Sequence, residues 1–118
     1  MPKTIKDILA ELTGTEGVLG CALVGLDGMV ISGHFIVEVN LDRLGALMSS
    51  AYNTLDRVYG ELKQGSVLHA WVETERYCFL IQAVPMGLLV IVVRHDAALG
   101  LVRLGARRAI RRLEQTDM

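Results

Sequence analysis

Residues 40–62 read NLDRLGALMSSAYNTLDRVYGEL, and this stretch decides the fold. Its apolar residues recur at alternating steps of three and four, which places them on one side of an α-helix. They are Leu41, Leu44, Met48, Ala51, Tyr52, Leu55, Val58, Tyr59 and Leu62. Asn40 can cap the first turn, and Gly60 and Gly65 bracket the expected end. The stretch predicts one long helix, around which we expect the rest of the chain to be built.

Small residues form a second row on this helix, beside the apolar stripe. Gly45, Ser49 and Asn53 follow one another at steps of four, and Ala46 lies close by. A row without bulky side chains lets another backbone approach closely. Two interpretations stay open at this point. The row is either an exposed polar flank or a contact with a second helix.

The other expected elements are shorter and lie on both sides of the long helix. Their ranges are 4–12 for a first helix, 17–24 and 29–32 for two strands, 67–73, 77–84 and 88–93 for three further strands, and 97–115 for a final helix. Residues 33–39 either extend the second strand or form a loop. Asp27-Gly28 indicates a hairpin turn, and Asp96 is the expected cap of the final helix.

The strand sequences also predict how the layers are arranged. Residues 77–84 are apolar apart from Gln82, and residues 88–93 are apolar throughout. Strands of this kind are covered on both faces, and short turns between them favour an antiparallel arrangement. We therefore predict one α/β domain over residues 1–118, with a five-stranded antiparallel sheet between layers of helix in the order α-β-β-α-β-β-β-α.

Composition limits the classes of partner. The net charge of −1 gives the whole molecule no attraction for nucleic acid or for a membrane surface. The longest apolar run, residues 88–93, is far too short to span a bilayer. Met1-Pro2-Lys3 leads into a polar segment without the features of a signal peptide. Cys21 and Cys78 lie in separate apolar stretches, which is typical of buried free thiols in a reducing compartment. We expect a cytoplasmic protein.

No pattern of catalytic or metal-binding residues is visible. His34, His69 and His95 lie far apart in the sequence, and neither Cys-x-x-Cys nor His-x-x-x-His spacing occurs. We therefore expect no enzyme active site, no metal and no cofactor.

The final helix carries five arginines on one face: Arg103, Arg107, Arg108, Arg111 and Arg112. This face is either a solvated surface or a site for an acidic partner.

The strand at 67–73 has the features of an exposed sheet edge. It contains no proline, and an unprotected edge invites pairing with another chain unless a loop covers it. Together with the small-residue row, this strand favours a homodimer. The residues expected at the dimer contact are Gly45, Ala46, Ser49, Asn53, Val67, His69 and Trp71.

Two segments resemble a known family. Residues 17–32, GVLGCALVGLDGMVIS, resemble the opening hairpin of roadblock domains, the dynein light chain roadblock family. Residues 98–113, ALGLVRLGARRAIRRL, resemble its closing helix, and residues 99–103 are the most recognisable piece. The order of helices and strands also agrees, so the resemblance covers essentially the whole chain. Within this family, the chain is similar to the bacterial or archaeal MglB-like branch.

The resemblance implies a longin- or profilin-like fold, with the long helix on one face of the sheet and the terminal helices on the other. It also implies dimers formed through the long helix and the third strand, and a role as a platform or regulator of small Ras-like GTPases, not as an enzyme. We expect Ser50, Asn53 and Arg57 to contact such a GTPase. Two alternatives are a scaffold subunit that is indifferent to nucleotide and a small-ligand sensor that uses the sheet face.

Overall fold

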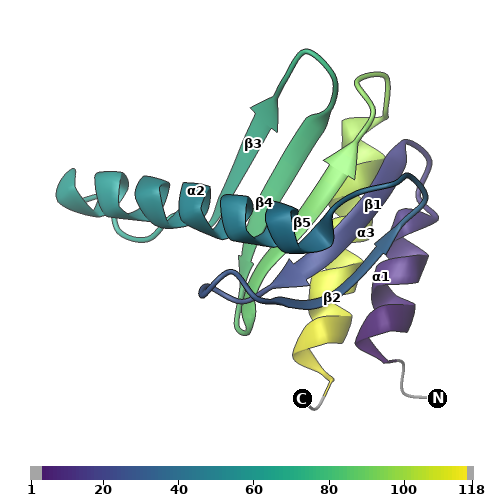
Figure 1. Cartoon of the computed structure of the whole chain (residues 1–118), viewed down its shortest axis with the longest axis horizontal. Helices are drawn as coiled ribbons and strands as arrows, with labels where there is room; N and C mark the ends of the chain where they lie inside the picture. Colours follow the sequence, from purple (N-terminus) through teal and green to yellow (C-terminus); the bar gives the residue numbers. More distant parts are fainter. Residues whose placement is uncertain (1–3, 117–118) are drawn as a thin grey trace.

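The computed structural model describes residues 4–116, which form three helices and five strands (Figure 1). These are α1 (Ile5–Thr13), β1 (Val18–Val24), β2 (Val30–Phe35), α2 (Leu41–Glu61), β3 (His69–Glu73), β4 (Cys78–Val84), β5 (Gly87–Val93) and α3 (Leu99–Glu114). The predicted order of elements is confirmed, and most boundaries agree within one or two residues. Residues 33–35, left open by the sequence, extend β2.

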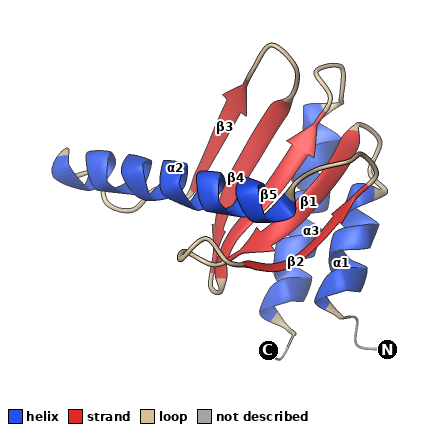
Figure 2. Ribbon diagram, in the orientation of Figure 1, coloured by secondary structure: helices blue, strands red, loops and turns tan. Residues whose placement is uncertain are grey.

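The five strands form one sheet in the order β2-β1-β5-β4-β3, and all neighbours are antiparallel. Helix α2 crosses one face, while α1 and α3 lie side by side on the other face (Figures 1 and 2). Every residue of the central strands β1 and β5 is buried, as their unbroken apolar sequences predict. The predicted sheet between helical layers is confirmed.

The hydrophobic core is divided by the sheet into two unequal parts. The larger part joins α1 and α3 to the sheet, and the smaller part lies under α2. Tyr52 is the buried apolar residue that α2 contributes to the smaller part. Val58, Tyr59 and Leu62 are 40%, 44% and 60% exposed. The apolar stripe of α2 is therefore buried only in part, because the last turns of the helix extend beyond the sheet (Figure 1).

The small-residue row of α2 packs against its own chain. A side chain at Gly45 would place Cβ 2.7 Å from Val30 Cγ2 and 3.0 Å from the Gly28 carbonyl oxygen. Ser49 is also buried. The Asn53 side-chain amide donates a hydrogen bond to the Leu26 carbonyl, at 3.2 Å. Gly45 and Ser49 are therefore covered by the turn between β1 and β2, whereas Ala46 and Asn53 lie beside this turn and stay exposed.

The ends of α1 and α3 differ in their capping. Thr4 caps α1 through a reciprocal pair of bonds with Asp7, as its sequence predicts. In contrast, α3 begins after Ala98, which makes no side-chain cap. Asp96 pairs with Arg94 at 3.3 Å, so its predicted capping role is wrong. A turn over residues 94–97 delays the start of the helix, and Leu99 at its first position is 40% exposed.

Both cysteines are free and buried, as predicted. The Cys21 thiol donates to the Leu9 carbonyl at 3.2 Å and lies 3.4 Å from the Thr13 hydroxyl. Burial raises the pKa of Cys21 to about 11, and the Thr13 hydrogen bond opposes part of this increase.

Within the part of the chain that the structure describes, none of the helices has the length and apolar character needed to cross a bilayer.

The contact between α2 and the β1–β2 turn predicts opposite effects of one substitution at two glycines of the same helix. Gly45→Ala should lower the free energy of unfolding by about 1–3 kcal/mol, because the new methyl group has no room. Gly60→Ala should raise it by about 0.5–1 kcal/mol, because no atom lies within 4 Å of the new methyl group and alanine favours the helix. Urea unfolding followed by circular dichroism measures both; equal stability of the two variants would contradict the packing.

The environment of Cys21 predicts a loss of stability at alkaline pH. The ordinary thiol pKa is 9.0 and that of folded Cys21 is about 11, so between these values the unfolded chain releases a proton that the folded chain keeps. The free energy of unfolding therefore falls by about 1.4 kcal/mol per pH unit in this window from this group alone. Cys21→Ser removes that contribution. Between pH 8 and about 10.5, the free energy of unfolding should decline less steeply in the variant than in the wild type. Equal slopes in the two proteins would contradict the raised pKa of Cys21.

Candidate interaction surface

Strand β3 is an open edge of the sheet. Across the described residues, β4 is the one strand that pairs with β3, in a register that runs from His69–Gln82 to Glu73–Cys78. The opposite edge strand, β2, is tied to α1, because the Thr13 hydroxyl donates to the His34 carbonyl at 3.2 Å. The outer backbone groups of β3 are therefore available to another chain.

An apolar groove of about 520 Å³ lies between β3 and the second half of α2. It is lined by Leu55, Tyr59 and residues 64–72. Leu68 is 70% exposed and Val72 is 42% exposed, so the groove carries apolar surface next to the open edge. An exposed apolar surface of this kind typically marks a site of protein contact.

The connection between α2 and β3 is held by two hydrogen bonds at Val67. The Tyr52 hydroxyl donates to the Val67 carbonyl at 2.8 Å, and the Val67 amide donates to the Asp56 carboxylate at 2.9 Å. Burial raises the pKa of Tyr52, and the nearby Asp56 carboxylate raises it further. The hydroxyl therefore keeps its proton at neutral pH, and these bonds hold the base of the groove in place.

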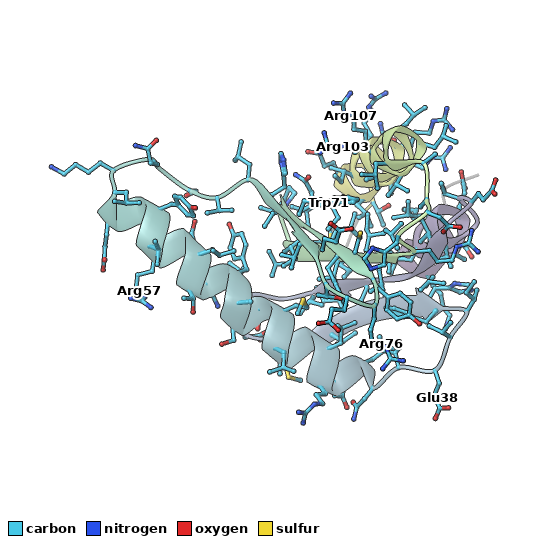
Figure 3. All side chains as sticks on the ribbon, turned by 90° about the horizontal axis from the view of Figure 1, so that it is seen from above. Glu38, Arg57, Trp71, Arg76, Arg103 and Arg107 are labelled. Atoms are coloured by element: carbon cyan, nitrogen blue, oxygen red, sulfur yellow. The ribbon has the colours of Figure 1, made fainter. Side chains whose placement is uncertain are left out.

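The side chains of β3 alternate between the two faces of the sheet. His69, Trp71 and Glu73 lie on the α3 side, whereas Ala70 and Val72 lie on the α2 side. Trp71 packs against the larger core, and the Arg103 guanidinium lies 5.9 Å from the centre of its ring. Figure 3 shows Trp71, Arg103 and Arg107 on this side of the sheet and Arg57 on α2.

Helix α2 presents different chemistry around its circumference. One flank carries Leu55 and Tyr59 toward the groove, and Val58 and Leu62 continue its apolar surface. The opposite flank holds Asn53, which is bonded to the β1–β2 turn. Steps of 100° per residue place the exposed Ser50 and Arg57 on the outer face, away from the sheet. The three residues predicted to bind a partner are all exposed, and their role stays a prediction.

The predicted dimer residues fall into two separate groups. Gly45 and Ser49 are buried under the β1–β2 turn of their own chain, which does not fit the predicted contact with a second helix. Ala46 and Asn53 lie on the same flank, beside Gly28 and Leu26. Val67, His69 and Trp71 belong to β3 and the segment before it, and their assignment stays a prediction. The predicted dimer residues did not include the apolar flank of α2, although Val58 and Tyr59 are exposed and Leu55 and Tyr59 line the groove.

The arginine face of α3 is largely exposed, as predicted. Arg103, Arg107, Arg108 and Arg111 are exposed, whereas Arg112 forms an ion pair with Glu11 on α1. Arg103 and Arg107 also line a shallow hollow with His69 on β3. The positive surface therefore extends from α3 to the edge of the sheet.

An antiparallel sheet with helices on both faces, an open edge strand and an apolar groove beside it defines an interaction module. The chain belongs to the Roadblock/LC7 domain family, whose family model matches residues 4–93. Membership in this family supports a regulatory or scaffold role, and Roadblock/LC7 folds are regulatory or adaptor domains that are not known as enzymes.

Individual relatives agree with this assignment. The chain is 31% identical over 110 residues to the uncharacterized protein MJ1340 of Methanocaldococcus jannaschii, covering 93% of this chain and 96% of that protein. Its fold is similar to Myxococcus xanthus MglB, with a TM-score of 0.87, 19% identity and coverage of 94% and 92%. It is also similar to a structure described as MglB with tetrameric arrangement, with a TM-score of 0.83, 23% identity and coverage of 94% and 88%. The predicted resemblance to MglB-like roadblock domains is confirmed.

Proposed function

We propose that the chain is a non-enzymatic homodimer that binds a small Ras-like GTPase and modulates its nucleotide cycle. The observation that carries the proposal is the open β3 edge beside the apolar groove. Membership in the Roadblock/LC7 family supports the regulatory part, and the fold likeness to MglB supports the choice of this branch. In the cell we place the complex in the cytoplasm.

The proposed dimer pairs the two β3 strands and covers the two grooves. Pairing at β3 would satisfy the outer backbone groups of both edges and continue the sheet across two chains. The apolar flank of each α2, with Leu55, Val58 and Tyr59, would then lose its exposure. Stable interfaces typically bury about 800 Å² per partner, which a strand pair and two helices can provide. The tetrameric arrangement named for one MglB structure is consistent with self-association in this fold.

The proposed GTPase site is the outer face of α2. Ser50 and Arg57 are exposed there, and Asn53 lies at its margin next to the β1–β2 turn. A protein that contacts the switch loops of a GTPase distinguishes its nucleotide states, because these loops change their order with the γ-phosphate. The chain would act by holding those loops in one arrangement, without supplying a reacting group.

A nucleotide-indifferent scaffold would use the same dimer and differs only in its response to the GTPase state. A small-ligand sensor would need a more enclosed site than the groove beside β3, which is open along the strand. We therefore favour a protein partner. The experiments below separate self-association from nucleotide-dependent binding.

A charge in the groove should prevent self-association. Leu68→Glu places two carboxylates in the proposed symmetric contact, where like charges are costly, and should weaken the dimer by at least about tenfold. Leu101→Glu is the matched control, because Leu101 is similarly exposed at 54% but lies on α3. Analytical ultracentrifugation of the wild type and both variants measures the dissociation constant of the dimer. A wild-type monomer, or an unchanged dimer in Leu68→Glu, would overturn the proposed contact.

The wild-type chain should retain a Ras-like GTPase from an extract of its source with a non-hydrolysable GTP analogue, and much less with GDP. With the purified GTPase, Arg57→Glu should weaken binding by about tenfold, which corresponds to 1.4 kcal/mol. Arg111→Glu makes the same charge change on α3 and should leave binding unchanged. Retention regardless of nucleotide would favour the scaffold, and no retained GTPase with either nucleotide would contradict the regulator.

A further inference from the structure

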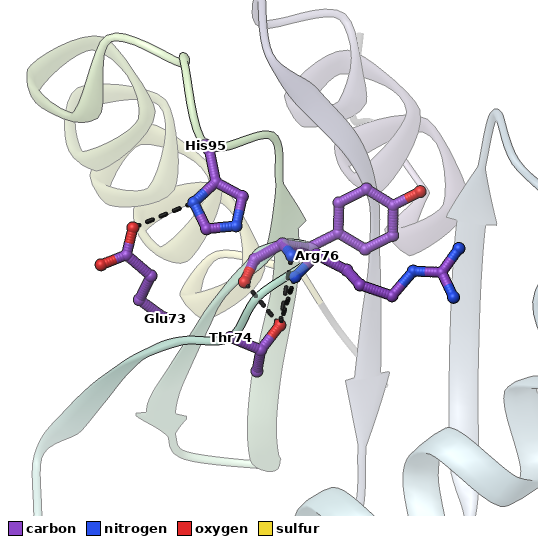
Figure 4. A network of polar contacts seen from close by, with 5 residues as sticks. Glu73, Thr74, Arg76 and His95 are labelled. Atoms are coloured by element: carbon purple, nitrogen blue, oxygen red, sulfur yellow. Dashed lines mark hydrogen bonds and ion pairs between the residues drawn. The ribbon is translucent and has the colours of Figure 1, made fainter.

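Three side chains with different metal-binding atoms meet at one end of the sheet. Glu73 ends β3, Cys78 begins β4, and His95 follows β5. One ligand atom from each, a carboxylate oxygen, the thiol sulfur and a ring nitrogen, lies within 4.8 Å of the other two. His95 Nδ1 and Glu73 Oε2 are already 2.9 Å apart (Figure 4).

The backbone register of the sheet determines this arrangement. Glu73 lies opposite Cys78 in the β3–β4 pair, and Cys78 lies opposite Val93 in the β4–β5 pair. Side chains at opposed positions share one face of a sheet, and His95 is two residues beyond Val93. Glu73 and Cys78 therefore come from adjacent strands, and His95 joins them from the segment just after the next strand, β5.

The turn between β3 and β4 holds two of these strands together. The Thr74 amide donates to the Tyr77 carbonyl at 2.8 Å. The Thr74 hydroxyl in turn accepts from the Tyr77 amide at 3.1 Å and from the Arg76 amide at 3.3 Å (Figure 4). Because this turn has its own hydrogen bonds, Glu73 and Cys78 are held next to each other without help from a ligand. The first two ligands are preorganised.

We propose that Glu73, Cys78 and His95 form a binding site for a divalent zinc ion. A thiolate, an imidazole nitrogen and a carboxylate oxygen are the three kinds of protein ligand that zinc accepts, in tetrahedral sites. Thiolate and imidazole disfavour magnesium and calcium, which prefer oxygen ligands throughout. The thiol releases its proton when the zinc–sulfur bond forms, and the two anionic ligands then balance the charge of the ion.

The burial of the three residues fits a site that is reached from solvent. Cys78 is buried in the sheet, whereas Glu73 and His95 are exposed. An ion can therefore approach from the side of the exposed residues and bind the sulfur below them. Three protein ligands leave a fourth position for water or for a donor from another molecule.

Zinc at this position would connect three consecutive strands. It would attach the end of the edge strand β3 to the start of β4 and to the segment that leads from β5 into α3. Since an exposed His–Glu pair alone adds little stability, the bound ion would be the main constraint at this end of the open edge. The inference does not depend on the GTPase or on the dimer.

Cobalt is a spectroscopic probe for this site, because Co²⁺ takes the same ligands as zinc. One equivalent of Co²⁺ added to the reduced wild-type protein should give a thiolate-to-cobalt charge-transfer band and the visible bands of tetrahedral cobalt, and Zn²⁺ should remove both. His95→Ala and Glu73→Gln should each weaken zinc binding by at least about tenfold, measured by competition with a chromophoric chelator. Both residues are exposed, so the variants should fold.

Matched controls come from residues of the same kinds outside the cluster. His69→Ala removes an exposed histidine of β3, the strand that carries Glu73, and Cys21→Ser removes the other thiol; both variants should bind zinc as the wild type does. Cys78→Ala should lose the charge-transfer band. The proposal is overturned if the wild type shows no thiolate–cobalt band, or if His95→Ala and Glu73→Gln keep wild-type affinity. Leu68→Glu should bind zinc normally, which separates this result from that of the dimer.

Discussion

The close approach of α2 to the β1–β2 turn determines which surfaces the molecule presents. Gly45 lies where a side chain would meet Val30 and the carbonyl of Gly28, and Gly28 has a φ of +89°, which favours glycine. Because Gly45 and Gly28 have no side chains, the backbone of α2 packs directly against the turn. This contact sets the rotation of α2, because the flank that faces the turn is no longer available to anything else.

The rotation explains why one flank of the second half of α2 is apolar and yet partly exposed. Leu55 and Tyr59 line the groove beside β3, and the end of α2 extends beyond the sheet (Figure 1). The same constraint that buries the small residues therefore places the apolar flank next to the open edge. An edge strand and an adjoining apolar helix form one continuous surface, and this continuity is the physical basis for the proposed self-association.

Periodicity in the sequence was sufficient to predict the elements and the layers. The unbroken apolar runs of β1 and β5 require cover on both faces, and the structure has it. Periodicity was not sufficient to predict the rotation of α2, because it reports which side chains are apolar and not how closely two backbones approach. Asp96 had the residue type of a cap, but its pairing with Arg94 and the turn at 94–97 moved the helix start to Leu99.

The cluster of Glu73, Cys78 and His95 shows a second limit of reasoning from spacing. A metal site on one helix or one turn leaves a short spacing motif, whereas this cluster is assembled by register across three strands. A signal was present in the hairpin: Glu73 and Cys78 flank a four-residue turn, which places them opposite each other once the turn closes. His95 could not be added from the sequence, because its position depends on β4 pairing with β5 in one register. Antiparallel sheets can therefore bring ligands together that are 22 residues apart, such as Glu73 and His95, without any local pattern.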